Sequence, residues 1–157
     1  MSGKPLDKLN IEHLIKNVVT DSLLETLGER AVDLIRKRTR LGYGVTSDEK
    51  LGATQQKLDG LTASTKEKRA RLAEQGRLSS ETTPAKSNLT ETGELLNSIR
   101  FRIQGRRLEV FIDGTDNNII AYEVSKQRPF FTLTQPEVSR LAAIIEQAIQ
   151  NYISKGN

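Results

Sequence analysis

The sequence has no cysteine, no tryptophan and a single histidine, His13. Without cysteine the chain forms no disulfide framework, and it offers neither a thiolate ligand for zinc nor a thiol nucleophile. One histidine does not supply the several imidazoles of common hydrolytic zinc sites. These absences exclude the usual forms of thiol and zinc chemistry, so we expect no metal, no cofactor and an ordinary role for His13.

Aromatic residues make up only 4% of the chain, and long apolar runs are missing. So few aromatic rings disfavour a platform on which nucleic-acid bases stack. No run reaches the roughly 18 apolar residues that a membrane-spanning helix needs. The first ten residues also lack the apolar core of a secretory signal, so we expect a soluble protein that folds in a reducing compartment.

What is present is a mildly basic chain of 157 residues, which is the length of one ordinary domain. It carries 24 lysines and arginines against 20 acidic residues, for a formal net charge of +4. That excess is smaller than the imbalance typical of a dedicated DNA-compacting protein. We therefore treat residues 1–157 as a single domain.

Apolar residues at helical spacing predict a long first helix over residues 10–40. The stripe begins at Ile11 and continues to Ile35, with Asn10 suited to be its N-cap. A helix of this length is expected to bend, and we place the bend at Gly28.

Residues 41–92 form a long polar insertion in which glycine recurs and apolar residues are sparse. Residues 66–75 are expected to form a short helix that Gly76 ends, supported by a Glu67–Arg71 pair. The remainder lacks a sustained period. Such a segment is normally disordered or ordered by a partner, so we expect the insertion to be extended or ordered by neighbouring subunits.

Strict alternation of apolar and polar residues beyond residue 98 predicts antiparallel strands. Two strands are joined by a turn at Gly105, and a third is expected through residues 120–124 after the turn signal DGTDN. The strand positions that we assign to the core are Ile99, Phe101, Ile103, Leu108, Val110, Ile112 and Tyr122.

A capping box at Thr134 and Glu137 opens a last helix with a clean apolar stripe. The fold class that follows is α+β. We expect the long N-terminal helix and the C-terminal helix to pack on a small three- to four-stranded antiparallel sheet, with the long polar insertion between them.

No catalytic constellation stands out. Asp113 and Asp116 are a carboxylate pair, but they lie in a turn sequence that favours these residues for its geometry alone. No serine lies in a nucleophile elbow, and neither a phosphate-binding loop nor a dinucleotide fingerprint is present. We predict that the protein is not an enzyme and has no catalytic or metal-binding residues.

Basic residues gather in three clusters, at the end of the first helix, within the insertion and along the sheet. Acidic residues are interspersed, and a solvated surface or helix-end electrostatics explains much of the pattern. The interaction residues that we predict, including an aromatic anchor before the last helix, are Arg36, Lys37, Arg38, Arg40, Lys66, Lys68, Arg69, Arg71, Arg100, Arg102, Arg128, Phe130 and Phe131.

Four motifs, in this order, span nearly the whole chain. They are RTRLGYG from Arg38, the Leu61-Thr62 pair with KEKRAR from Lys66, LTETGELLNSI from Leu89, and RPFFTL from Arg128. Together they resemble the head–tail joining or tail-completion family of tailed bacteriophages, often called phage virion morphogenesis proteins. The chain departs from that family between Tyr122 and Arg128, where family members often carry a longer loop.

The resemblance implies a structural protein of the virion neck or tail end. Such proteins form homo-oligomeric rings, commonly of six or twelve copies, between the portal complex and the tail tube, and DNA passes through them. The expected partners are therefore further copies of the chain, portal-side connector proteins and tail tube proteins, with transient contact to passing DNA and no membrane. The expected location is the virion, after synthesis in the host cytoplasm.

An alternative from another functional class is a small basic accessory protein that binds nucleic acid. It would use the cluster from Arg36 to Arg40 and the cluster from Arg100 to Arg107. Binding of this kind weakens steeply as salt is added, because phosphate contacts release counterions.

Overall fold

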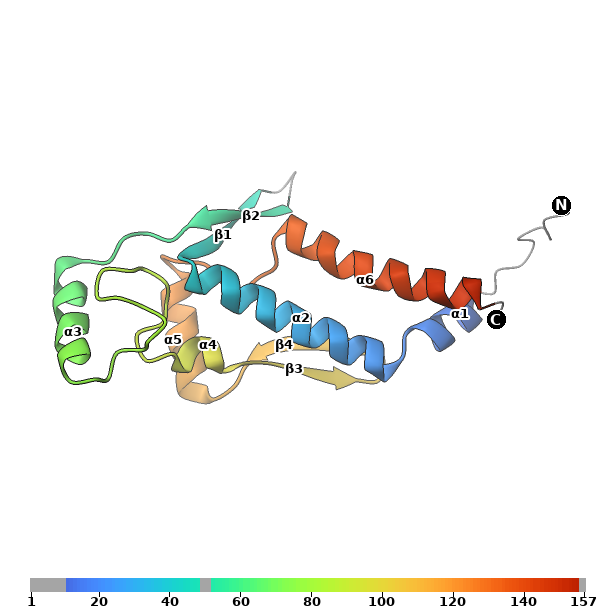
Figure 1. Ribbon diagram of the computed structural model, residues 1–157, viewed down its shortest axis with the longest axis horizontal. Helices are drawn as coiled ribbons and strands as arrows, with labels where there is room; N and C mark the ends of the chain where they lie inside the picture. The colour runs from blue at the N-terminus through green and yellow to red at the C-terminus, as the bar shows by residue number, and fades with distance from the viewer. Residues whose placement is uncertain (1–10, 49–51, 156–157) are drawn as a thin grey trace, which may run out of the picture.

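The computed structural model describes residues 11–48 and 52–155, and it confirms a mixed α+β fold with about 52% helix and 16% strand. Pairs of helices and pairs of strands follow one another along the chain of an elongated molecule (Figure 1). In chain order they are α1 (Ile11–Val18), α2 (Asp21–Arg40), β1 (Tyr43–Asp48), β2 (Gly52–Lys57), α3 (Ala63–Glu74), α4 (Glu94–Asn97), β3 (Ile99–Gln104), β4 (Arg107–Ile112), α5 (Thr115–Ser125) and α6 (Gln135–Ser154).

The predicted first helix is two helices, α1 and α2, which are separated at Val19 and Thr20. Thr20 is the N-cap of α2, and its hydroxyl accepts a hydrogen bond from the backbone N–H of Leu23 at 3.2 Å. The break therefore lies where a threonine satisfies a free N–H group. The predicted bend at Gly28 is wrong, because Gly28 lies inside the continuous helix α2, and the predicted N-cap Asn10 lies outside the described residues.

Gly28 is instead the point where α2 meets the sheet. A Cβ atom added there would lie 2.5 Å from Cγ of Phe101 and 2.7 Å from Cε2 of the same ring. Real Cβ atoms do not approach ring carbons so closely, so only glycine lets the Phe101 ring of β3 lie directly on the helix backbone.

Replacing Gly28 by alanine is expected to lower the free energy of unfolding by about 1–3 kcal/mol, because the new methyl group overlaps the Phe101 ring. At a solvent-exposed helix position the same change would stabilise the protein by about 1 kcal/mol. Urea unfolding followed by circular dichroism measures the difference. In a Phe101→Ala background the sign should reverse, and destabilisation of the same size in both backgrounds would contradict this packing.

Within residues 11–48 and 52–155, the strands form two separate antiparallel hairpins. β1 pairs with β2 from Tyr43 opposite Lys57, and β3 pairs with β4 from Ile99 opposite Ile112. Gly105, at φ 60°, turns the second hairpin as expected. The β1–β2 hairpin lies within the insertion and was not predicted, because its residues are mostly small or polar and lack a regular alternation of apolar and polar side chains.

The third strand predicted at residues 120–124 is wrong, because this segment is part of α5, and the sheet of three to four strands is replaced by two hairpins. Its apolar residues fit a strand period, but its partly or fully buried positions follow a helical one. Asn117, Ala121 and Val124 face inward at spacings of four and three. Tyr122, predicted to be in the core, is consequently 68% exposed.

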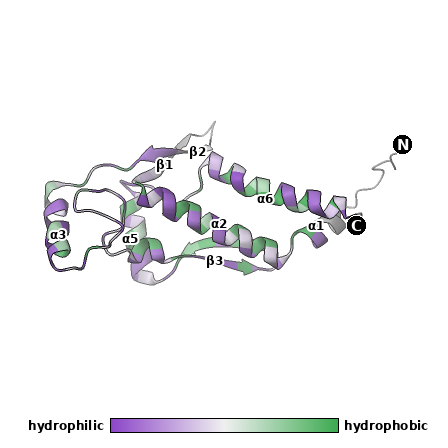
Figure 2. Cartoon of the chain, viewed as in Figure 1, coloured by the Kyte–Doolittle hydropathy of each residue, from purple (hydrophilic) through white to green (hydrophobic). Residues whose placement is uncertain are grey.

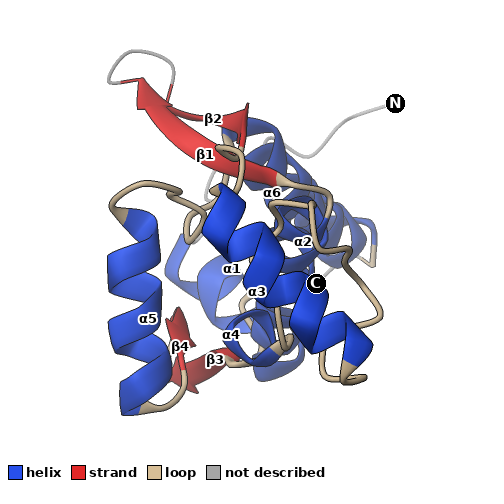
Figure 3. Cartoon of the chain, turned by 90° about the vertical axis from the view of Figure 1, so that its left-hand side faces the viewer, coloured by secondary structure: helices blue, strands red, loops and turns tan. Residues whose placement is uncertain are grey.

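The core lies around α2, between the two hairpins. The hairpins lie on opposite sides of the helices (Figure 3), and apolar residues are concentrated where α2 meets β3 and β4 (Figure 2). Ile99 and Ile112 are buried there as predicted, whereas Phe101 and Val110 are partly buried at its edge. The buried core cluster is Val32, Ile35, Leu96, Ile99, Ile112, Ala121 and Phe130.

The insertion contains β1, β2 and α3. Polar side chains hold the chain that follows α3 to itself and to the end of α2. The predicted short helix is confirmed as α3, with Arg71 Nη2 2.6 Å from Glu67 Oε1. Asn88 is fully buried and donates from Nδ2 to the carbonyls of Arg40 and Glu81. One buried amide thus ties the segment after α3 to the end of α2. Further ordering of residues 41–92 by neighbouring subunits stays a prediction.

The last helix, α6, begins with the predicted capping box: Thr134 Oγ1 accepts from the N–H of Glu137, and Glu137 Oε2 accepts from the N–H of Thr134. The helix lies along α2 and extends toward α1 (Figure 1). None of the helices in the described ranges is long and apolar enough to span a membrane.

Candidate functional site

The basic cluster at the end of α2 is largely directed into the molecule. Arg36 donates from Nε to the carbonyl of Leu96 at 2.9 Å, and from Nη2 to the carbonyl of Ile99 at 2.7 Å. It therefore satisfies carbonyl groups at the end of α4 and the start of β3. Lys37 is exposed and pairs with Asp33 at 2.9 Å on the helix surface.

Arg38 is buried and connects three segments. It forms an ion pair with Glu137, and its Nη2 donates to the carbonyl of Phe130 at 2.5 Å and to that of Thr132 at 2.9 Å. Burial lowers the pKa of Arg38, and the nearby Glu137 carboxylate acts in the opposite direction. The residue links the end of α2, residues 130–132 and the first turn of α6.

Arg40 lies at the boundary between the core and the insertion. Its Nε is 2.9 Å from Glu81 Oε2, and its Nη2 donates to Asn97 Oδ1 at 3.2 Å. Burial lowers the pKa of the neighbouring Arg36, and the positive charges of Arg100 and Arg40 lower it further. The first cluster therefore serves internal contacts, apart from the exposed Lys37.

In the second cluster, Arg69 is only 2% exposed, although it lies on a polar helix. It donates to the carbonyl of Lys86 at 2.5 Å and to Thr82 Oγ1 at 2.9 Å. Burial lowers its pKa, the Glu91 carboxylate acts in the opposite direction, and the charge of Arg128 lowers the pKa further. Its Nε is buried without a hydrogen-bond acceptor among the described residues.

The other residues of the second cluster are exposed on α3. Lys68 pairs with Glu91 at 2.8 Å, and Arg71 pairs with Glu67 along the helix. Surface pairs of this kind contribute little to stability. Lys66 is exposed, and within the described ranges it makes no ion pair.

The third cluster lies on the β3–β4 hairpin. Arg100 donates to the carbonyl of Asn97 at 2.6 Å. Arg102 pairs with Glu109 at 2.8 Å across the two strands, and its guanidinium lies 5.1 Å from the centre of the Phe111 ring. Neighbours on the same hairpin therefore satisfy much of this basic surface.

Of the three predicted residues before α6, Arg128 lines a pocket, whereas Phe130 and Phe131 pack toward the core. Phe130 is fully buried, and its ring meets that of Phe131 edge to face at 6.2 Å. Arg128 is half-buried; its backbone N–H donates to the carbonyl of Val124, but its guanidinium has no hydrogen-bond or ion-pair partner in the described part of the chain. It lines a pocket together with residues of the second cluster.

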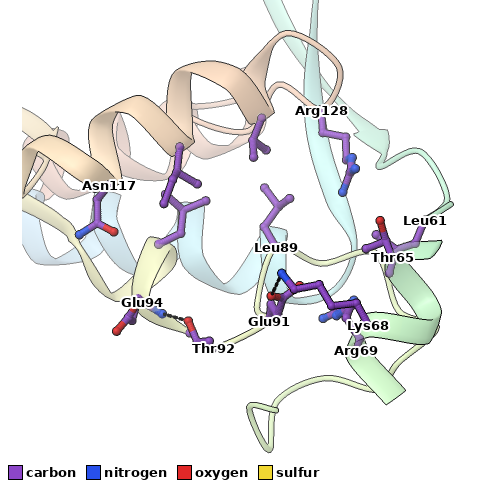
Figure 4. A pocket seen from close by; sticks show the side chains of 14 residues that line it. Leu61, Thr65, Lys68, Arg69, Leu89, Glu91, Thr92, Glu94, Asn117 and Arg128 are labelled. Atoms are coloured by element: carbon purple, nitrogen blue, oxygen red, sulfur yellow. Dashed lines mark hydrogen bonds and ion pairs between the residues drawn. The ribbon is translucent and has the colours of Figure 1, made fainter. Parts of the chain in front are cut away.

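This hollow, which we call the α3–α5 pocket, has a volume of about 330 Å³ and lies between α3, α5 and the chain that leads into α4. Figure 4 shows Arg128 and Leu89 directed into it from opposite sides, with the Lys68–Glu91 ion pair at one edge. Ile120 and Val124 of α5 add apolar surface. The pocket therefore combines an apolar wall with an unpaired cation.

Leu89, one wall of the pocket, is held in a strained backbone conformation. Its φ of 55° is in the left-handed region and makes it the one residue other than glycine, within the described ranges, with a positive φ. That conformation costs a side chain with a Cβ about 1 kcal/mol or more. Strain of this kind concentrates at ligand and partner sites, where the surrounding structure maintains it.

Two exposed apolar surfaces lie on different helices. The first, which we call the α5 ridge, consists of Ile119, Ile120 and Tyr122. Ile120 lines the α3–α5 pocket, and Tyr122 lines another hollow together with Val45 and Phe131. The second we call the α6 stripe. It lies on the part of the apolar face of α6 that α2 leaves uncovered. The α6 stripe consists of Val138, Ile145 and Ile153.

The structure brings together motifs that are far apart in the sequence. Arg38 of the first motif binds the carbonyl of Phe130 in the fourth, and Arg69 of the second lines the pocket with Leu89 of the third. Sequence reasoning found these residues but missed the α5 ridge, because it assigned the same side chains to a strand. The apolar positions of this segment carry no helical signal, because the inward-facing positions Asn117, Ala121 and Val124 include a polar residue.

Metal binding finds no support in the ranges that the structure describes, where no group of three or more histidine, cysteine, aspartate or glutamate residues is placed to hold an ion. The prediction that the protein is not an enzyme is not tested by this geometry. Comparison of the chain with known protein families, curated proteins and solved structures found no match.

Proposed function

We propose that this protein is a structural component of the neck or tail end of a tailed-phage virion, where it forms a homo-oligomeric ring that joins head to tail. The observation that carries the proposal is the pair of exposed apolar surfaces, the α5 ridge and the α6 stripe, on different parts of one small chain. Exposed apolar patches mark interaction sites.

Two unlike surfaces favour a ring over a simple dimer. A two-fold dimer uses the same patch on both subunits and needs only one such surface. When one patch binds a different patch on the next copy, every added copy leaves one of each kind free, and the series closes into a ring if the rotation permits. The α5 ridge and the α6 stripe meet this requirement.

The resemblance to the head–tail joining family supplies the place of the ring in the virion. Its motifs lie at the junction of α2 with α6 and around the α3–α5 pocket. The proposed partners are portal-side connector proteins and the tail tube, with DNA passing through the ring. The arginines that point inward leave less basic surface for the alternative function, nucleic-acid binding, because Arg36, Arg38 and Arg69 bind groups of the chain itself.

Native mass spectrometry of the purified protein, together with electron microscopy of the virion, tests the ring. We expect a species several times the 17.5 kDa subunit mass, with six or twelve copies, and matching density between head and tail tube. Replacing Ile119 and Tyr122 by serine should shift the species toward monomer, because the α5 ridge loses apolar area.

The control is Leu41→Ser, which replaces another exposed apolar residue that belongs to neither surface. It should leave the mass distribution as in the wild type. A monomer both in solution and in the virion would rule out the ring. Duplex binding that weakens steeply with salt, by a protein that remains monomeric, would instead favour the alternative function.

A further inference from the structure

The α3–α5 pocket has the chemistry of a site for a carboxylate that stands beside a branched aliphatic side chain. Arg128 reaches into it without a partner among the described residues, and the nearby Arg69 has a buried Nε that lacks an acceptor. Leu89, Ile120 and Val124 supply the apolar wall. A guanidinium near an apolar surface pairs best with a carboxylate that brings its own apolar neighbour, because both contacts then exclude water.

The chain itself carries such a group. Among the described side chains, several carboxylates form no ion pair, and they include Asp116, Glu146 and Glu94, which itself lines the pocket. Asp116 lies on α5, the helix that forms one wall of the pocket. Glu146 lies on α6, next to Ile145 of the α6 stripe.

We propose that the α6 stripe of one copy docks on the α5 ridge of the next, with Ile145 against Ile120 and Glu146 at the Arg128 side of the α3–α5 pocket. This assignment rests on the proposed ring, and it names the two surfaces that form each contact. The apolar residues exclude water from the interface, and the charge pair at its edge selects the partner surface and fixes the register.

The geometry of the chain agrees with a head-to-tail contact. α5 and α6 occupy different parts of the elongated molecule (Figure 1), so the two surfaces on one copy do not meet each other. Each copy presents the α5 ridge to one neighbour and the α6 stripe to the other. Repetition of the contact therefore orders the copies in one direction, as a ring requires.

The absence of cysteine makes the contact directly testable by disulfide trapping. Ile120→Cys and Ile145→Cys are made separately in the full chain, at positions that are 49% and 37% exposed. A disulfide forms only when the two Cα atoms come within about 7 Å. After mixing and mild oxidation, we expect a dimer of the two unlike variants at about 10-fold the yield of either variant alone, and a ladder of multimers from the double variant.

Charge reversal supplies an independent arm of the test. Arg128→Glu and Glu146→Arg should each weaken self-association about 10-fold or more, and the variant with both changes should recover it. Arg106→Glu is the matched control, because it makes the same charge change in the β3–β4 turn, and it should associate as the wild type does. Circular dichroism checks folding, and Ile120→Ser serves as a second ridge variant if Arg128→Glu does not fold.

The outcomes separate this contact from the ring itself. Trapping of Ile120→Cys with itself at the higher yield would mean a two-fold contact and would overturn the assignment. If the wild type is oligomeric but the mixed variants are trapped no better than an Arg106→Cys and Ile145→Cys pair, the assignment fails and the ring stands. If the wild type is monomeric in solution and in the virion and no pair is trapped, both fail.

Discussion

Replacing Arg38 by alanine is expected to lower the free energy of unfolding by about 3–5 kcal/mol, because Arg38 is one half of a buried ion pair. The change leaves the Glu137 carboxylate buried without its partner and removes the donors to the Phe130 and Thr132 carbonyls. An unpaired buried charge is far more costly than a lost surface pair, because water cannot replace the partner. Chemical denaturation monitored by circular dichroism provides the measurement.

Lys37→Ala is the matched control, because it removes the neighbouring cation from an exposed pair with Asp33. It should change the free energy of unfolding by no more than about 0.5 kcal/mol. A double change of Arg38 and Glu137 to methionine should cost less than Arg38→Ala, since it leaves no unpaired charge. Equal effects of Arg38→Ala and Lys37→Ala would show that the Arg38 ion pair does not hold α2 to α6.

Phe130→Ala is expected to destabilise the protein by about 3–5 kcal/mol, because a fully buried ring is replaced by a cavity. Phe130 packs in the core cluster with Ile35, Leu96 and Ile112. Its backbone carbonyl also receives a hydrogen bond from Arg38, so the cavity opens at the junction of the two long helices. Thermal and urea unfolding should both show the loss.

The adjacent Phe131 provides the comparison. It is partly buried and packs at the edge of the same cluster, so Phe131→Ala should cost about 1 kcal/mol, well below the cost at Phe130. If the two variants were equally destabilised, residues 130 and 131 would not divide into a core anchor and a peripheral contact. A small effect at Phe130 alone would place that ring outside the core.

The segment before α6 shows what a sequence motif predicts and what it does not. The RPFFTL motif singles out Arg128, Phe130 and Phe131 as a group with one role, but the three residues have different environments. Phe130 is buried, Phe131 is partly buried, and Arg128 reaches into the α3–α5 pocket. Burial depends on which elements pack against a residue, and that information is distributed over contacts between residues far apart in the sequence.

The basic clusters show the same limit. Composition and spacing identify Arg36, Arg38 and Arg69 as basic and suggest an external surface. Each of them instead donates to backbone carbonyls or side chains within the chain. An arginine presents several donors on a long stem, so it satisfies internal carbonyl groups as readily as it binds an external anion. The sequence pattern is the same whether an arginine binds carbonyl groups of its own chain or an external anion.

By itself, the sequence determined the elements that local rules specify strongly. The capping box of α6, the β3–β4 hairpin with its glycine turn, the helix α3 with its Glu67–Arg71 pair and the mixed α+β class all follow from periodicity, capping and turn chemistry. The lack of cysteine and the scarcity of histidine and aromatic residues also follow from it directly, together with the chemistry that they exclude.

Only the tertiary structure decided whether residues 115–125 form a strand or a helix, and which basic residues remain free. The apolar residues of that segment fit a strand period, yet packing of Ala121 into the core selects the helix. That choice exposes Ile119, Ile120 and Tyr122 and creates the α5 ridge. Local propensity differs between the two forms by too little to choose, so long-range burial of a few side chains makes the decision.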